Sequence, residues 1–166
     1  MLRIVVATAA LVLAVSCARA DPVAEFYKGQ QIKLIVGYGT EAPEFNWDDY
    51  KGLDVAGKTL VMLVNDPPLP DTSQFGGPRM TYYGRWTYKY EQGQKHKAAG
   101  VLLVHETEAA GYPFTVVQGK TSEQFDLVTP DKNMLRAAVE GWITLDQAKA
   151  LLKMAGQDFD ALKASA

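Results

Sequence analysis

The chain is organised around Met80-Thr-Tyr-Tyr-Gly-Arg-Trp-Thr-Tyr-Lys-Tyr-Glu-Gln-Gly-Gln-Lys-His-Lys-Ala-Ala-Gly-Val-Leu-Leu-Val-His-Glu106. Trp86 and Tyr90 lie four residues apart, which places both on one face of a helix that begins near Tyr82. Val101-Leu-Leu-Val104 is a continuous apolar run, which is typical of a strand covered on both faces. The stretch therefore predicts one helix that leads into one buried strand.

A second buried strand is predicted upstream, at Thr59-Leu-Val-Met-Leu-Val-Asn65, and it stops at Asp66-Pro67-Pro68 because proline cannot continue a ladder. Two parallel strands joined by a crossover that contains a helix form a right-handed βαβ unit. Gly93 lies inside the predicted helix, where glycine costs about 1 kcal/mol relative to alanine. We therefore expect the second half of that helix to be soft.

The remaining segments predict an α/β domain packed around this unit. The expected strands are Ile32–Tyr38, Pro113–Val117 and Phe125–Val128, while Leu135–Ile143 fits either a strand or a helix. Two loops are also expected. One is Thr40–Trp47, pinned by Phe45 and Trp47, and the other is an exposed loop at Leu69–Pro78.

The C-terminal region carries helix-start signals. Thr144 with Gln147 three residues on forms a capping box, and the helix that follows ends at Gly156. Asp158 is expected to cap a last short helix that carries Phe159.

Residues 1–20 have the pattern of a secretory signal peptide, with a basic start, an apolar stretch and Ala18-Arg19-Ala20 as a cleavage signal. We expect a periplasmic or secreted protein without a membrane span, because the apolar stretch is too short for one. Acylation of Cys17, as in a lipoprotein, is the alternative, although Ala14 fits that pattern poorly. Residues 21–31 are expected to be a flexible N-terminal segment, and residues 32–166 the domain itself.

Composition and charge exclude several classes of function. The 166 residues are 48% hydrophobic and 22% charged, as in one globular domain. Loss of residues 1–20 changes the formal net charge from −2 to −4, because Arg3 and Arg19 leave with them. An acidic surface gives no reason to expect binding to nucleic acid or to an anionic membrane. The single cysteine leaves too, which removes disulfides and thiol chemistry.

Several pieces of the sequence together identify a family: Val-Gly-Tyr-Gly (36–39), Ala-Pro-Glu-Phe-Asn-Trp-Asp-Asp-Tyr-Lys-Gly (42–52), Val-Asn-Asp-Pro (64–67), Met80–Glu91, Gly100–Glu106, Glu123–Val128 and Trp142–Ala164. With these pieces the chain from about residue 37 to 166 resembles the protease-associated (PA) domain of bacterial zinc aminopeptidases, in the aminopeptidase/glutamate-carboxypeptidase superfamily. The resemblance implies a strand-rich open barrel or sheet with flanking helices. It also implies a place at the mouth of a peptidase cleft and no catalytic residue of its own.

Residues 21–39 are similar to a second family, the mature start of tripartite tricarboxylate transporter substrate-binding proteins. In those proteins a glycine-rich loop follows the first strand, whereas Thr40-Glu-Ala-Pro43 follows here. The shared Val-Gly-Tyr-Gly at 36–39 suggests a junction between two gene pieces. A small periplasmic solute-binding protein is therefore one alternative function, although such receptors are normally about twice this length.

The residues needed for zinc peptidase chemistry do not occur in the required pattern. The resembled family uses a His-x-Asp pair, a bridging Asp, a Glu-Glu pair and a later His, which together hold two zinc ions. The two histidines here, His96 and His105, do not begin a His-x-Asp. His105-Glu-Thr-Glu108 lacks the second histidine of a zincin and is interpreted as a strand end that meets solvent. His96, between two lysines, is expected on the surface.

Paired carboxylates are the other candidate for chemistry. Asp48 and Asp49 are adjacent, but neighbours in a strand point to opposite faces, so a shared acid/base pair is not expected. Lys58 and Asp66 are interpreted as polar residues at strand ends. No catalytic, metal or cofactor residue is therefore predicted in this chain.

The aromatic helix start supplies the candidate binding residues. Core packing accounts for part of the group, and we expect Tyr82, Tyr83, Arg85 and Trp86 to contact a peptidase domain or its peptide substrate. The leading hypothesis is a non-catalytic PA domain that serves protein interaction or substrate gating, as a fragment without its peptidase domain. A portion or subunit of an active zinc aminopeptidase is the alternative, and it requires a partner that supplies every metal ligand.

Overall fold

The computed structural model describes residues 36–69, 74–118, 125 and 127–165. Residues Ile32–Ala166 form one compact unit. The expected signal peptide, the segment 21–31 and most of the strand expected at Ile32–Tyr38 lie outside the described residues.

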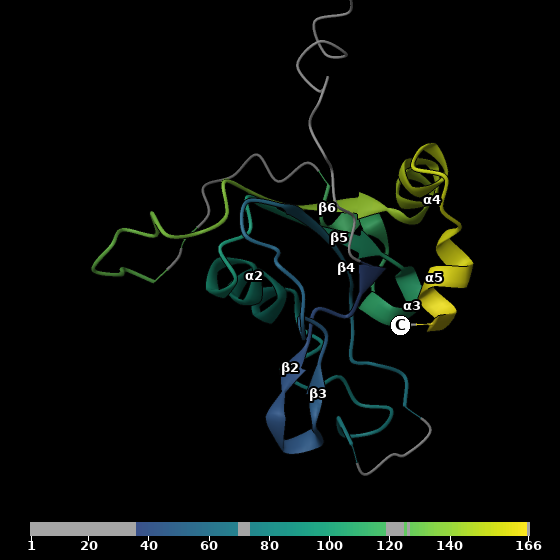
Figure 1. The fold of residues 1–166 in the computed structure, drawn as a ribbon, viewed down its shortest axis with the longest axis horizontal. Coiled ribbons are helices and arrows are strands. Elements are labelled where there is room, and N and C mark those ends of the chain that lie inside the picture. The colour runs from purple at the N-terminus through teal and green to yellow at the C-terminus, as the bar shows by residue number, and fades with distance from the viewer. Residues whose placement is uncertain (1–35, 70–73, 119–124, 126, 166) are drawn as a thin grey trace, which may run out of the picture. The chain divides into compact units, whose positions relative to one another are not determined.

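A four-stranded sheet forms the centre of the unit. Its strands are β1 (Val36–Gly37), β4 (Thr59–Leu63), β5 (Gly100–His105) and β6 (Val139–Thr144), in the order β1-β4-β5-β6 with every neighbouring pair parallel. The predicted pairing of the two apolar runs is confirmed, with Leu60 opposite Val101. The crossover between them carries α2 (Trp86–Lys95), as Figure 1 shows. The chain is therefore α/β, and its described strands do not close into a barrel.

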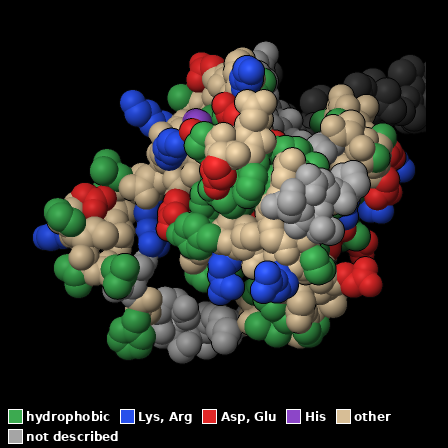
Figure 2. Space-filling view, turned by 90° about the horizontal axis from the view of Figure 1, so that it is seen from below, with side chains coloured by type: hydrophobic (Ala, Val, Ile, Leu, Met, Phe, Trp, Pro, Cys, Tyr) green, Lys and Arg blue, Asp and Glu red, His purple; other side chains and the backbone are tan. Residues whose placement is uncertain are grey.

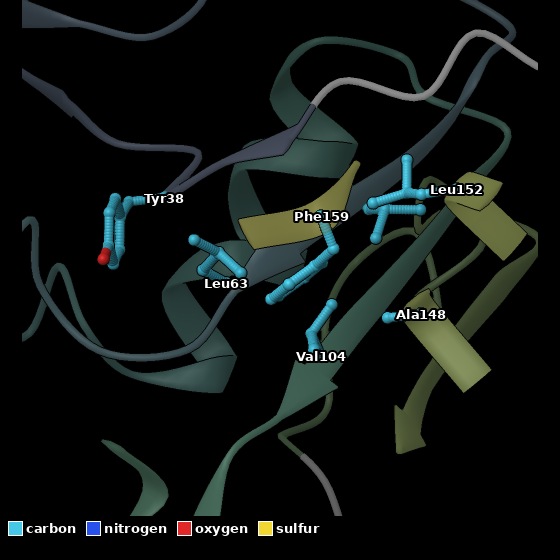
Figure 3. Packing of buried hydrophobic residues seen from close by; sticks show 7 residues of the cluster. Tyr38, Leu63, Val104, Ala148, Leu152 and Phe159 are labelled. Atoms are coloured by element: carbon cyan, nitrogen blue, oxygen red, sulfur yellow. The ribbon is translucent and has the colours of Figure 1, made fainter. Parts of the chain in front are cut away.

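One face of the sheet packs against the C-terminal helices α4 (Leu145–Met154) and α5 (Phe159–Ser165). Figure 3 shows Phe159 at the middle of this cluster, between Leu63 and Val104 from the strands and Ala148 from α4. All four side chains are at most 3% exposed. The helix predicted after Thr144 therefore places its apolar side chains against the sheet, as an amphipathic helix does.

The opposite face carries the alternate residues of the same strands. Leu60 and Met62 of β4 and Val101 and Leu103 of β5 form a second cluster on the side of α2, with Tyr50, Val55 and Ala98. Successive side chains of a strand point to opposite faces, so a run of apolar residues fills two cores at once. The continuous apolar runs are explained by this double burial.

Both predicted helix caps are present. The backbone N–H of Gln147 donates to the Thr144 hydroxyl over 3.1 Å, and the Thr144 N–H donates back to the Gln147 side chain over 3.0 Å. At α5, the Asp158 carboxylate accepts a hydrogen bond from the Ala161 N–H over 2.7 Å. Gly156, with φ +73°, ends the preceding helix in a conformation that suits glycine.

Two of the expected strands are wrong. Phe114–Val116 forms a short 3-10 helix, η2, where a strand at Pro113–Val117 was predicted. Described residues of Phe125–Val128 form no strand, and Phe125 and Val128 are 94% and 100% exposed. A short apolar run becomes a strand only where a neighbour pairs with it, and here none does. Figure 2 shows several hydrophobic side chains on the described part of the loop that leads to β6, at the left of the view.

The ambiguous stretch Leu135–Ile143 divides into two parts. Its first part lies outside the sheet, with Leu135 69% exposed. The second part belongs to β6, which starts at Val139 and pairs with β5. Trp142 packs against the cluster on the α2 face, as expected of a residue that borders the core.

The two expected loops are more ordered than the sequence indicated. Residues 40–47 contain a small antiparallel pair, β2 (Glu41–Ala42) with β3 (Trp47–Asp48), joined by the 3-10 turn η1 (Pro43–Phe45). The second loop is not wholly exposed, because Phe75 is 1% exposed. The Phe75 ring lies 4.7 Å from that of Phe45 and 5.9 Å from that of Trp47. The aromatic residues expected to pin the first loop therefore hold the second loop against it.

Helix α2 begins at Trp86 and not near Tyr82. The residues before it form turns, in which the Gly84 N–H donates to the Thr81 carbonyl and the Arg85 N–H to the Tyr82 carbonyl. The helix starts later than predicted because residues before Trp86 contact the chain that follows β4. A local sequence pattern does not record such contacts.

Gly93 has a packing role that the helix pattern did not show. A Cβ atom built at Gly93 would lie 2.3 Å from Cγ2 of Val101, which is fully buried in β5. Val101 is β-branched and has little rotamer freedom to move away. The absence of a side chain at Gly93 therefore lets α2 approach the sheet.

Gly93→Ala should destabilise the protein by about 1–3 kcal/mol, because overpacking outweighs the helix-propensity gain of about 1 kcal/mol. Urea unfolding of Gly93→Ala, Val101→Ala and the double variant measures this. In the Val101→Ala background the same glycine substitution should become neutral or stabilising. A Gly93→Ala variant more stable than the wild type would contradict the close approach.

Candidate functional site

The candidate site lies at the carboxyl edge of the sheet, where β4 and β5 end at Leu63 and His105. In α/β folds, ligands bind in crevices outside the carboxyl ends of parallel strands. The chain that follows β4 continues through Asn65 and Asp66, and the chain that follows β5 forms the short helix α3 (Thr107–Ala110). These segments and the start of α2 meet at this edge.

Asn65 and Asp66 hold the edge together. The Asn65 side-chain amide donates to the Ala109 carbonyl over 3.2 Å, which ties the end of β4 to α3. The Asp66 carboxylate accepts from the Thr81 N–H over 2.6 Å and from the Thr81 hydroxyl over 2.8 Å. Asp66 was interpreted as a polar strand end, and in the structure it is a buried anchor for the segment that precedes α2.

Gly84 holds the segment before α2 against the residues that follow β4, by close backbone contact. A Cβ at Gly84 would lie 2.8 Å from the backbone nitrogen of Asp66 and 2.9 Å from the carbonyl carbon of Asn65. Its carbonyl accepts the N–H of Asn65 over 3.0 Å. Only glycine fits this approach, which explains why the chain makes a turn here and why the helix starts two residues later.

A pocket of about 110 Å³ opens where the segment before α2 meets the residues that follow β4. The described lining residues come from three segments: Val64 after β4, then Met80 and Arg85 before α2 with Trp86 at its first position, and Ala110 and Tyr112 after β5. Trp86 is 45% exposed, so its indole offers apolar surface to an incoming group. Of the four predicted contact residues, the structure places Arg85 and Trp86 in this lining.

Tyr82 and Tyr83 lie elsewhere. The Tyr82 hydroxyl donates to the Glu91 carboxylate over 2.6 Å, and the Tyr83 hydroxyl donates to the carboxylate of Glu44 on η1. Both rings meet Tyr88 edge-on, at centroid distances of 5.6 and 5.1 Å. The predicted aromatic group is therefore divided between the pocket and the contact with the β2–β3 pair.

Electrostatics at the pocket rim come from Arg85 and Tyr112. Burial raises the pKa of Tyr112, and the nearby Arg85 guanidinium opposes that rise. The ion pairs within the described residues involve other cations: Lys95, His96, Arg136, Lys149 and Lys163. Arg85 is exposed and is not among them. The rim thus presents a cation and a protonated phenol.

Sequence reasoning missed a buried cation, Lys89 on α2. Its side chain is 0% exposed, and its ammonium donates to the Thr40 hydroxyl over 3.3 Å. Asp49 and Asp66 are the carboxylates that attract it, and the Tyr88 ring lies 5.9 Å from the ammonium. An ammonium taken out of water is stable only with such partners.

The pKa values in this cluster follow from burial. Burial lowers the pKa of Lys89 from 10.5 to about 7, against the attraction of Asp66 and Asp49. Burial also raises the pKa of Asp49, although the Thr40 N–H and the Trp47 indole donate to it over 2.8 and 2.9 Å. Two ionisable groups of opposite charge are therefore each displaced toward their neutral forms.

The helical spacing of the residues around Lys89 was the sequence signal that could have predicted its burial. The buried residues of α2 are Tyr88, Lys89, Gln92 and Gly93, which repeat at the spacing of one helix face. The aromatic spacing of Trp86 and Tyr90, whose rings lie 5.8 Å apart, draws attention to a different face. A lysine between tyrosines does not by itself indicate burial.

Both histidines are more buried than expected. His105 is 4% exposed and does not meet solvent. Its Nε2 has no hydrogen-bond partner among the described residues, and the rings of Tyr112, Phe114 and Trp142 lie 5.4–5.7 Å away. His96 is partly covered, because its ring stacks on Tyr50 at 3.9 Å. Its Nε2 lies 3.2 Å from the Glu41 carboxylate.

The acidic residues near these histidines do not converge. Glu106 pairs with Lys163 of α5, and Glu108 is exposed. Asp48 accepts the Tyr50 N–H over 2.8 Å, whereas Asp49 faces Thr40 and Trp47, so the adjacent pair points to different partners. Across the described residues no group of three or more His, Cys, Asp or Glu is placed to hold a metal ion. No helix in the same residues has the length and apolarity needed to span a bilayer.

Fold and site together define an α/β domain with a small pocket at the carboxyl edge of a parallel sheet. Comparison of the chain with family models, curated proteins and solved structures finds no match.

The stability of the protein should rise with pH between about 7 and 9.5 because of Lys89. Its folded pKa, about 7, is below its ordinary value of 10.5, so in this range the unfolded chain binds more protons than the folded chain. One such group contributes at most about 1.4 kcal/mol per pH unit. Urea unfolding across this range measures the slope, which Lys89→Met should remove.

Lys153→Met, at an exposed lysine of α4, is the matched control and should keep the wild-type slope. The slope is the readout, and not the stability at one pH, because methionine also removes the attraction to Asp49 and Asp66. Equal slopes in the wild type and in Lys89→Met would show that Lys89 is charged throughout this range.

Proposed function

We propose that this chain is a non-catalytic interaction module of the PA type, which contacts a peptide or a peptidase domain through the carboxyl edge of its sheet. The observation that carries the proposal is the pocket beside the start of α2, where an exposed indole and an exposed guanidinium stand together. Tryptophan and arginine are enriched among the residues that contribute most to protein interfaces. The sequence resemblance to PA domains, from about residue 37 onward, supports the same role.

The lining chemistry favours binding over catalysis. The described residues that line the pocket are Val64, Met80, Arg85, Trp86, Ala110 and Tyr112, and none of these carries a carboxylate, imidazole or thiol. Burial raises the pKa of the Tyr112 phenol, so it is a poor base near neutrality. Such a lining can hold an apolar group and an anion, but it offers no nucleophile and no general base.

The structural setting of the pocket also suits recognition. Asn65, Asp66 and Gly84 fix its walls by hydrogen bonds and backbone contact, so the walls need little reorganisation on binding. In the proposed role any zinc belongs to a partner peptidase domain. A secreted or periplasmic location, expected from residues 1–20, would place the module where extracellular peptides occur.

Trp86→Ala should abolish peptide binding while leaving the fold intact, because Trp86 is half exposed and lies outside both core clusters. Binding is measured by ¹H–¹⁵N spectra of the purified chain titrated with short peptides. The Trp86 indole N–H is an additional reporter in the wild type, and the backbone N–H resonances of Val64 and Tyr112 report in both the wild type and the variant. Met154→Ala, at a residue 87% exposed on α4, is the control and should bind as the wild type does.

The same preparation separates the module from a zinc peptidase. Zinc content is measured after purification with added zinc, and hydrolysis is measured with an aminoacyl nitroanilide. We expect no stoichiometric zinc and no turnover. Stoichiometric zinc with turnover would overturn the non-catalytic assignment, and unchanged indole resonances with every peptide would overturn the binding role.

A further inference from the structure

We propose that the pocket receives the carboxyl-terminal residue of a peptide, with an aliphatic side chain in the cavity and the terminal carboxylate on Arg85. This inference rests on the proposed binding function and names the class of ligand. Three observations carry it: the size of the pocket, the chemistry of its lining, and the presence of Arg85 and Trp86 in the same lining.

The size of the cavity limits what can enter. Small-molecule pockets usually measure several hundred Å³, and a cavity of about 150 Å³ holds benzene. At about 110 Å³, this open pocket has room for one branched aliphatic side chain and is small for a bicyclic ring. The occupant is therefore a single residue of a longer molecule that continues into solvent.

The lining combines aliphatic side chains with two polar ones. Val64 is 3% exposed, and with Met80 and Ala110 it forms an aliphatic surface beside the Trp86 indole. Arg85 and Tyr112 also line the pocket, close enough for the guanidinium to affect the ionisation of the phenol. An arginine and a protonated phenol are both donors that suit a carboxylate.

Because Arg85 and the apolar lining belong to the same small pocket, one residue of the ligand can supply both the anion and the aliphatic group. Arg85 and Trp86 are consecutive and line the same small cavity, so the anion and the aliphatic group must be close together. The last residue of a peptide carries both on one α-carbon. An acidic side chain would have to come from a neighbouring residue, which places the anion farther from the aliphatic group.

The local charge at the pocket is positive because of Arg85, whereas the net charge of the whole chain is negative. The whole chain is acidic, with a formal net charge of −2, so its overall field does not attract an anion. Capture of a carboxylate must then depend on the one rim arginine, and it should weaken with added salt because that arginine is exposed. A weak, salt-sensitive preference for a free carboxyl end follows.

The test compares acetyl-Gly-Gly-Leu as the free acid and as the amide, titrated into the purified chain and followed at the Trp86 indole resonance. The acid should bind about three- to fivefold more tightly than the amide, with dissociation constants in the millimolar range, because an exposed charge-assisted contact adds a modest increment. In Arg85→Gln the two forms should bind equally. Arg79→Gln removes a nearby exposed arginine outside the pocket and should keep the preference.

Further peptides separate the sources of each contact. Acetyl-Gly-Asp-Leu-amide offers a side-chain carboxylate in place of the terminal one and should bind no better than the amide. Acetyl-Gly-Gly-Trp acid tests the size limit and should bind more weakly than the leucine acid. Circular dichroism of each variant confirms that the fold is kept.

The outcomes distinguish this inference from the proposed function. If acid and amide bind equally and both need Trp86, the ligand class is wrong and the interaction module stands. Tighter binding of the aspartate peptide likewise assigns Arg85 to a side-chain carboxylate and overturns the inference. If no peptide perturbs the indole, both proposals fail.

Discussion

The pairing of β4 with β5 is the constraint on which the rest of the structure depends. Five consecutive residue pairs join Thr59–Leu63 to residues 100–104, and their side chains alternate between two cores. Because each strand is buried on both faces, neither core can form without the other. Helices α4 and α5 cover one face, and α2 lies on the other, as Figure 1 shows. The carboxyl ends of the same two strands then determine where the pocket lies.

The close approach of α2 to the sheet allows tight packing on that face. It also buries a charged side chain, which costs free energy. Gly93 lets the helix lie against Val101, and Gly84 lets the chain before the helix contact the backbone after β4. The same helix carries Lys89 into the protein interior, where burial lowers its pKa to about 7. The carboxylates of Asp49 and Asp66 reduce that cost. Asp66 has two roles, since it also anchors Thr81 near the pocket wall.

The candidate site depends on these structural contacts without sharing their residues. Asn65, Asp66 and Gly84 fix the edge, while Arg85 and Trp86 remain exposed beside it. A rigid frame with an exposed aromatic residue and an exposed cation suits recognition, because little ordering is required on binding. The proposed role in peptide or peptidase contact follows from this arrangement together with the resemblance to PA domains.

The sequence by itself determined the features that rest on local periodicity and caps: the two apolar strands, their parallel pairing, the capping box at Thr144 and the helix that follows it. Strands at Phe125–Val128 and Pro113–Val117 were wrong because a strand also needs a pairing partner, which no short run specifies. Only the tertiary structure decided that Phe75 and His105 are buried, that Lys89 is enclosed, and that Arg85 and Trp86 share a pocket with Tyr112. Burial and proximity between residues distant in the chain depend on how the elements pack, and that packing is set by the whole core at once.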